Sequence, residues 1–160
     1  MISRVLWAGL SSIATIGHAD KLDDIKRGGV VNIAVFDSNP PFGYVDPETK
    51  RIVGCDVDIA KGIGKALGVK VELTATNPAN RIPLLSSKKV DLIAANFTIT
   101  DQRAKEVDFS VPYFATGQKF IARKGVLKQP DDIAKLRIGA DKGTVQEITL
   151  RDNYPTAKVI

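Results

Sequence analysis

The run "VVNIAVF" at residues 30–36 decides the fold class. It is apolar except for Asn32 and rich in β-branched side chains, a composition that suits a strand buried on both faces. Residues 37–41, "DSNPP", follow as a loop, because two prolines cannot donate hydrogen bonds to a strand ladder. The run therefore predicts a buried strand around which the other elements can be arranged.

The segments after this strand alternate between strands and helices. Asp56 is a predicted helix N-cap, apolar residues recur after it at helical spacing, and Gly68 can end the helix. In chain order the sequence predicts a strand at 30–36, a hairpin with arms at 42–45 and 51–53, a helix at 56–67, a strand at 69–75, a helical turn or two at 80–89 and a buried strand at 90–97. This order favours an α/β sheet with right-handed crossovers.

The same pattern restarts after Phe114. The later part of the chain predicts a strand at 118–125, a capped helix at 130–136, a short strand at 137–141, a helix at 145–153 and a last apolar piece at 158–160. These elements indicate a second βαβ unit, joined to the first at residues 115–118.

The first residues have the build of a secretory signal peptide. Arg4 precedes an apolar stretch at 5–17, and the small residues Gly17 and Ala19 occupy the positions expected before a cleavage site. The apolar stretch is shorter than the roughly 20 residues that a membrane-spanning helix needs. We therefore expect residues 1–19 to be removed and the mature protein to reach the periplasm.

Composition excludes several classes of site. His18 is the single histidine and is lost with the signal peptide, which excludes Ser-His-Asp hydrolysis and histidine-based metal catalysis in the mature chain. The net charge is +5, but Lys and Arg are scattered instead of forming a basic run, so no nucleic-acid partner is expected. Cys55, the single cysteine, is interpreted as a small buried apolar residue. No cofactor and no metal site are predicted.

Two patterns in the predicted helix at 56–67 fail as functional motifs. Asp56 and Asp58 are two residues apart, so they point to different sides of a helix and cannot share a proton. Gly62 and Gly64 lie in the middle of the helix instead of at a strand-to-helix turn, which excludes a dinucleotide-binding fingerprint.

The stretch "NFTITDQRAKEVDFS" at 96–110 carries the strongest sign of a binding site. Asn96 and Thr98 follow a buried strand, and Arg103 falls in the first turn of a predicted helix, where the helix dipole disfavours a cation. Arg103 could be an exposed residue paired with Glu106. Alternatively, it joins the Thr98 hydroxyl and strand-end N–H groups in a site for one carboxylate, at the sheet edge where α/β folds bind ligands.

Three ordered motifs resemble one protein family. They are "GCDVDIAKGIGKALG" at 54–68, "RIPLLSSKKVDLIAANFTITDQRAKEVDFSVPYF" at 81–114 and "DKGTVQE" at 141–147. Together they closely resemble the periplasmic solute-binding proteins of polar amino-acid ABC importers, the bacterial solute-binding family 3. The resemblance implies an α/β, periplasmic-binding-protein-like (type II) two-lobed flytrap, with lobe 1 at 20–114, a hinge at 115–118 and a partial lobe 2 at 119–160.

The resemblance also implies roles for single residues. Arg103 matches the arginine that clamps the ligand α-carboxylate, helped by the positions of Asn96 and Thr98. Val145 and Gln146 match contact positions on the second lobe.

The resemblance places a side-chain pocket at Phe36 and Asn39. Arg81 falls where some binders of acidic amino acids carry an arginine that meets the ligand side chain; the alternative is a solvated arginine at a helix start. The implied ligand is a polar amino acid, with glutamate or aspartate preferred and glutamine next.

The family implies a monomeric receptor that binds without chemistry and docks on the membrane subunits of an ABC permease. Its members usually continue beyond the position of Ile160 and carry there an acidic residue for the ligand α-amino group, so the chain is expected to be a C-terminally truncated member. Three alternatives stay open: an enzyme resembling cyclohexadienyl dehydratase, the sensor half of a receptor kinase, and a non-functional fragment of a binding protein.

Overall fold

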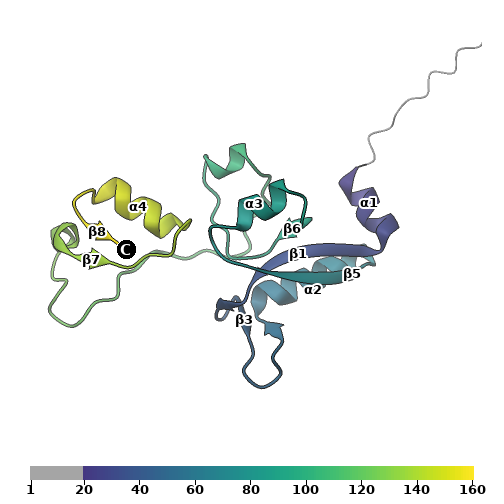
Figure 1. The fold of residues 1–160 in the computed structure, drawn as a ribbon, viewed down its shortest axis with the longest axis horizontal. Coiled ribbons are helices and arrows are strands. Elements are labelled where there is room, and N and C mark those ends of the chain that lie inside the picture. Colours follow the sequence, from purple (N-terminus) through teal and green to yellow (C-terminus); the bar gives the residue numbers. More distant parts are fainter. Residues whose placement is uncertain (1–19) are drawn as a thin grey trace, which may run out of the picture.

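The computed structural model describes residues 20–160, which form two groups of elements joined by extended chain (Figure 1). The larger group is built on a sheet in the order β5-β1-β6. Its strands are β1 (Val30–Phe36), β5 (Lys70–Thr76) and β6 (Leu92–Ile93), and β1 pairs in parallel with both neighbours. The central buried strand and the α/β order predicted for this part of the chain are confirmed. The signal peptide predicted at residues 1–19 lies outside the described residues.

Three helices pack around this sheet: α1 (Lys21–Gly28), α2 (Cys55–Leu67) and α3 (Arg81–Ser86). The core is made where α1 and α2 meet β1. Its buried members are Ile25, Val31, Ile33, Val35, Val57, Ala60 and Ala94. Helix α2 ends at Gly68, which is left-handed (φ 70°), as its position in the sequence predicts.

A small antiparallel sheet leaves the carboxyl end of β1. It consists of β2 (Ser38–Asn39), β3 (Gly43–Val45) and β4 (Ile52–Val53), in that order. The predicted hairpin is confirmed. Part of the predicted loop at 37–41 also pairs with it, because Ser38 and Asn39 lie opposite Tyr44 and Gly43 in β3.

The second group lies at the left of Figure 1 and follows the order predicted for residues 130–160. Its elements are the 3-10 helix η2 (Pro130–Lys135), β7 (Arg137–Ile138), α4 (Val145–Asn153) and β8 (Lys158–Val159). Strands β7 and β8 pair in parallel across α4, which gives a small βαβ unit.

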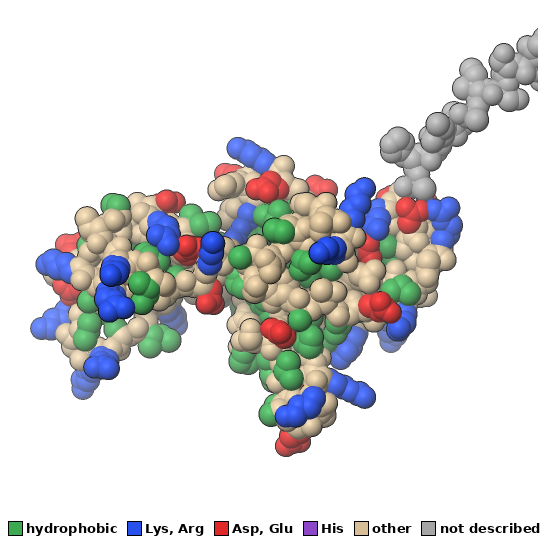
Figure 2. Space-filling model, viewed as in Figure 1, with side chains coloured by type: hydrophobic (Ala, Val, Ile, Leu, Met, Phe, Trp, Pro, Cys, Tyr) green, Lys and Arg blue, Asp and Glu red, His purple; other side chains and the backbone are tan. Residues whose placement is uncertain are grey.

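In residues 20–160 no helix has the length and apolar character needed to cross a membrane. On the face seen in Figure 2, Lys and Arg side chains are spread over both groups.

Two predictions, one in each part of the chain, are wrong. The segment at 118–125 is not a strand, since no strand of the described chain pairs with it, and Ile121 is fully exposed. Cys55 is exposed instead of buried, because α2 begins at this residue and turns the next two, Asp56 and Val57, into the protein.

One buried carboxylate connects three elements of the larger group. Asp91, just before β6, accepts hydrogen bonds from the backbone N–H (2.8 Å) and the Nδ2 (3.2 Å) of Asn32 in β1. It also forms an ion pair with Lys21 of α1, with Nζ at 2.7 Å. Burial by itself raises the pKa of Asp91, but the hydrogen bonds from Lys21 and Asn32 outweigh it and hold the pKa below its ordinary value of 3.8.

The first prediction concerns the pH dependence of stability. Asp91→Asn should lower the free energy of unfolding at pH 7 by about 1–3 kcal/mol, because the half-buried Asn32 donors and the Lys21 ammonium lose a charged acceptor. A lowered native pKa stabilises the fold above the unfolded-state pKa, and this stabilisation is lost as the pH falls through the native value. The difference between wild type and variant in urea unfolding should therefore shrink between pH 7 and pH 3. Asp58→Asn, at an exposed site, is the control; a difference that stays constant with pH would contradict the assignment.

The second prediction uses the two mid-helix glycines of α2. A Cβ on Gly64 would lie 2.2 Å from Cγ2 of Val71 in β5, whereas a Cβ on Gly62 meets nothing within 4 Å. Gly64→Ala should therefore destabilise the protein by about 1–3 kcal/mol through overpacking. Gly62→Ala should stabilise it by about 0.5–1 kcal/mol through helix propensity. Thermal unfolding of the two variants measures both effects, and shifts of the same sign would contradict the packing argument.

Candidate functional site

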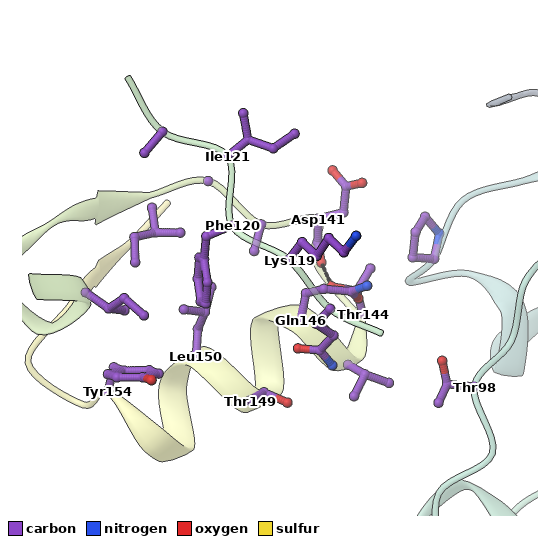
Figure 3. A pocket seen from close by; sticks show the side chains of 18 of the residues that line it. Thr98, Lys119, Phe120, Ile121, Asp141, Thr144, Gln146, Thr149, Leu150 and Tyr154 are labelled. Atoms are coloured by element: carbon purple, nitrogen blue, oxygen red, sulfur yellow. Dashed lines mark hydrogen bonds between the residues drawn. The ribbon is translucent and has the colours of Figure 1, made fainter. Parts of the chain in front are cut away.

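An open cleft of about 860 Å³ lies between the two groups of elements. In Figure 3, Thr98 faces Gln146 and Thr149 of α4 across this cleft. Its lining contains every residue that the sequence predicts for the ligand site: Phe36, Asn39, Arg81, Asn96, Thr98, Arg103, Val145 and Gln146. The structure thus brings together residues more than a hundred positions apart in the chain. Their contact with a ligand stays a prediction.

Arg103 is a buried cation, and most of its guanidinium donors have no partner in residues 20–160. Thr100 Oγ1 accepts the backbone N–H of Arg103 (3.2 Å), the first residue of the 3-10 helix η1 (Arg103–Lys105). The guanidinium lies over the Phe97 ring, 4.5 Å from its centroid, and 7% of the residue is exposed. It donates from Nη1 to the carbonyl of Thr98 (2.8 Å) and from Nη2 to that of Gly143 (3.0 Å). The alternative of an exposed arginine paired with Glu106 is wrong.

Arg81 is more deeply buried and more fully bonded. Its Nε donates to the carbonyl of Pro78 (3.0 Å), and its Nη1 donates to those of Ala95 and Asn96 (3.1 Å each). Its Nη2 donates to the carbonyl of Gly143 (3.2 Å). Only 3% of Arg81 is exposed, so the alternative of a solvated arginine is wrong.

The two guanidiniums lack a counter-charge in the described part of the chain. No Asp or Glu oxygen of residues 20–160 lies within 4.0 Å of either group. Burial, followed by repulsion from Arg103, lowers the pKa of Arg81 to about 10, and burial also lowers the pKa of Arg103. Both stay charged at neutral pH, and an anion in the cleft would offset their desolvation.

The loop before α4 brings the second group against the first. Gly143 has φ +80°, and a Cβ there would lie 2.8 Å from Cα of Ala79, so the approach needs a glycine. Its N–H donates to Oε2 of Glu147 (2.8 Å), and the Thr144 side chain caps α4 by accepting the N–H of Glu147. The hydrogen bond from Gly143, followed by that from Arg151, lowers the pKa of Glu147.

Asp56 lies next to the candidate site, and its predicted role as a helix N-cap is wrong. It is not the N-cap of α2, because the helix begins at Cys55 after Gly54. Its fully buried carboxylate instead accepts the backbone N–H of Asn96 (2.9 Å) and the hydroxyl of Tyr113 (3.0 Å). A signal for burial was present, since Asp56 shares one face of α2 with the buried Ala60 and Gly64 at a spacing of four residues.

An apolar extension of the cleft in the second group was also missed. It is lined by Phe120, Ile133, Leu136, Ile138, Leu150 and Tyr154. Figure 3 shows Phe120, Leu150 and Tyr154 on this side, away from Thr98. Prediction of a strand at 118–125 hid the role of Phe120, because this segment lines the cleft without pairing to a sheet of the described chain.

Known proteins resemble most of the chain. The family model for bacterial extracellular solute-binding proteins, family 3, matches residues 31–151. The glutamine-binding protein of Geobacillus stearothermophilus is 34% identical over 158 residues, which cover 95% of this chain and 60% of the relative. The chain thus spans about three fifths of that relative's length.

Solved structures agree with this match. An ancestral amino acid-binding protein, AncCDT-1, described as a precursor of cyclohexadienyl dehydratase, superposes with a TM-score of 0.79 at 32% identity, covering 88% of this chain and 64% of its own. A mutant of domain 1 of TmArgBP in its arginine-bound form has a TM-score of 0.57 at 43% identity, covering 60% and 74%. On the family match and the identity to these relatives, the chain belongs to the bacterial extracellular solute-binding proteins of family 3.

Proposed function

We propose that the chain is the amino-acid-binding part of a receptor that delivers a polar amino acid to the permease of an ABC importer. It binds by closure of the cleft and performs no chemistry. One observation carries this proposal: Arg103 is buried at the cleft, charged and without a carboxylate partner in residues 20–160. A guanidinium in such a position favours a ligand carboxylate, which it can bind through two parallel hydrogen bonds.

The donor count supports Arg103 as the clamp. A guanidinium has five N–H donors. Arg103 donates two of them to the carbonyls of Thr98 and Gly143, which leaves three that meet no acceptor in the described part of the chain and could bind a ligand. The first-turn N–H groups of Val145 and Gln146 have no partner within their helix, so they are further donors on the opposite wall.

Arg81 has a different role in this proposal. Four of its five donors go to backbone carbonyls, so it holds the strand ends and Gly143 in place and has little left for a ligand. Preference for an acidic side chain, which would need Arg81 as its partner, is therefore less favoured than preference for a neutral or basic polar amino acid. The named ligands of the relatives, glutamine and arginine, fit this view.

The working parts of the proposed receptor are lobe 1 at 20–114, the hinge at 115–118 and the partial lobe 2 at 119–160. The arginine-bound domain 1 of TmArgBP supports binding by a part of such a protein. Export to the periplasm through the signal peptide at 1–19 and action as a monomer complete the proposal. The enzyme alternative has less support, because the site offers no histidine and Asp141 is the acidic residue that lines the cleft.

The third prediction tests the clamp. Isothermal titration of the purified protein with a panel of amino acids should give binding for at least one polar member, and Arg103→Ala should weaken it by about a hundredfold, as expected for two charge-assisted hydrogen bonds. Arg103→Lys should recover little, because an ammonium lacks the planar fork. Lys105→Ala, on an exposed site of the same 3-10 helix, is the matched control. Absence of heat with every amino acid would mean that the chain is not a working receptor.

The fourth prediction separates the two roles of Arg81. If Arg81 holds the backbone, Arg81→Lys should weaken the binding of L-glutamate and L-glutamine by the same factor and also lower the thermal unfolding temperature. If it meets an acidic ligand side chain, the loss should be much larger for L-glutamate. We expect equal losses, measured by titration of both ligands, and a selective loss for L-glutamate would restore the acidic preference.

A further inference from the structure

Asn96 has an unusual backbone at the edge of the cleft. Its φ is +42°, in the left-handed region that residues other than glycine enter seldom, although asparagine does so more readily than most. Such conformations persist where the surroundings hold them, and they gather at functional sites. The question is which groups hold Asn96.

Two buried charges hold it from opposite sides. The carboxylate of Asp56 accepts its backbone N–H (2.9 Å), and Nη1 of Arg81 donates to its carbonyl oxygen (3.1 Å). Both side chains are buried, with 0% and 3% exposure. The peptide groups on either side of the Asn96 Cα are thus fixed, and with them the direction of the side chain that lines the cleft.

Asp56 accepts a second hydrogen bond, from a residue close to the segment that joins the two groups. Its Oδ1 accepts the hydroxyl of Tyr113 at 3.0 Å. The next residue, Phe114, packs edge-on against Phe42, with ring centroids 5.0 Å apart. The chain is therefore anchored to the first group up to Phe114, just before the segment that crosses to the second group (Figure 1).

We infer that Asp56 is a positioning residue for ligand binding: it holds Asn96 in its left-handed conformation at the cleft and fixes Tyr113 at the start of the joint. This inference rests on the proposed function, because it requires the cleft to hold an amino acid. Asp56 does not line the cleft, so it acts through Asn96. Burial raises the pKa of Asp56, which agrees with a hydrogen-bonded carboxylate that has no cation of residues 20–160 beside it.

The first arm of the test needs no ligand. In ¹⁵N-labelled protein, the amide proton of Asn96 reports directly on its bond to Asp56. Asp56→Ala should increase its hydrogen exchange at least tenfold relative to the core of β1 and move its resonance upfield. Asp56→Asn keeps an acceptor oxygen for Asn96 and should recover most of the protection. Asp58→Asn, an exposed aspartate of the same helix, is the matched control and should change neither readout.

The second arm measures binding of L-glutamine and of L-arginine by titration. Asp56→Ala should raise the Kd of the bound amino acid at least tenfold, with the fraction of binding-competent protein unchanged, and Asp56→Asn should recover most of the affinity. A residue with a merely structural role would reduce that fraction and leave the Kd unaltered. Tyr113→Phe, which removes one of the two donors, should move both readouts in the same direction by about threefold.

The outcomes separate the inference from the proposed function. If the wild type binds neither amino acid, the proposed function fails with these ligands, and the Asn96 amide still decides whether Asp56 positions it. Unchanged Asn96 exchange in Asp56→Ala would overturn the inference whether or not ligands bind. If Asp56→Ala does not fold, an unaltered Asn96 resonance and exchange rate in Tyr113→Phe would overturn it.

Discussion

The carbonyl oxygen of Gly143 accepts hydrogen bonds from both Arg81 and Arg103, and the site depends on this shared contact. It joins the loop before α4 to the strand ends of the larger group. Because the oxygen belongs to a glycine with positive φ pressed against Ala79, neither the residue type nor the backbone direction is free to vary. The width of the cleft at this point is set by backbone atoms, and the side chains farther out determine what fits beside them.

Phe97 keeps the two cations side by side. Both guanidiniums lie over its ring, at 4.2 Å for Arg81 and 4.5 Å for Arg103 from the centroid. The ring offers each cation a favourable electrostatic contact while excluding water from one side. Phe97 itself packs against Phe109, with centroids 5.4 Å apart. The two guanidinium groups thus lie side by side, and no Asp or Glu carboxylate of residues 20–160 pairs with them. An unpaired positive charge of this kind attracts a carboxylate strongly.

Local patterns in the sequence predicted the order of elements from β1 to β6 and the βαβ order of the second group. They did not predict α1, and the strand predicted at 90–97 is reduced to β6 (Leu92–Ile93). The apolar run at 30–36 and the helical spacing after Asp56 show within each segment which of its positions are buried. The strand and the helix predicted from them are therefore present in the structure. The residues of the site could be named because strand ends of a parallel sheet meet at one edge, and because the family motifs fixed which of them matter. The structure places these residues along one cleft, and their binding of a ligand is still a prediction.

Features that depend on distant partners could not be predicted. A strand at 118–125 needs an edge to pair with, and local alternation carries no information about that edge. Asp56 was assigned to a cap because spacing places it at a helix start, whereas its partners Asn96 and Tyr113 are 40 and 57 residues away. The bonds of Arg81 to four carbonyls are equally invisible in "NRIPLL".

The contact at Gly143 also bears on how an amino acid can enter. A backbone carbonyl is a neutral acceptor, so it satisfies donors of Arg81 and Arg103 without offsetting their charge, whereas a carboxylate does both. A ligand that used the three remaining donors of Arg103 would bind beside the Gly143 carbonyl and keep the two groups together. A ligand that displaced the carbonyl would have to separate them first. The Arg103 donors without a partner in residues 20–160 favour the first route, in which the proposed amino-acid ligand would add to a contact between the groups that already exists.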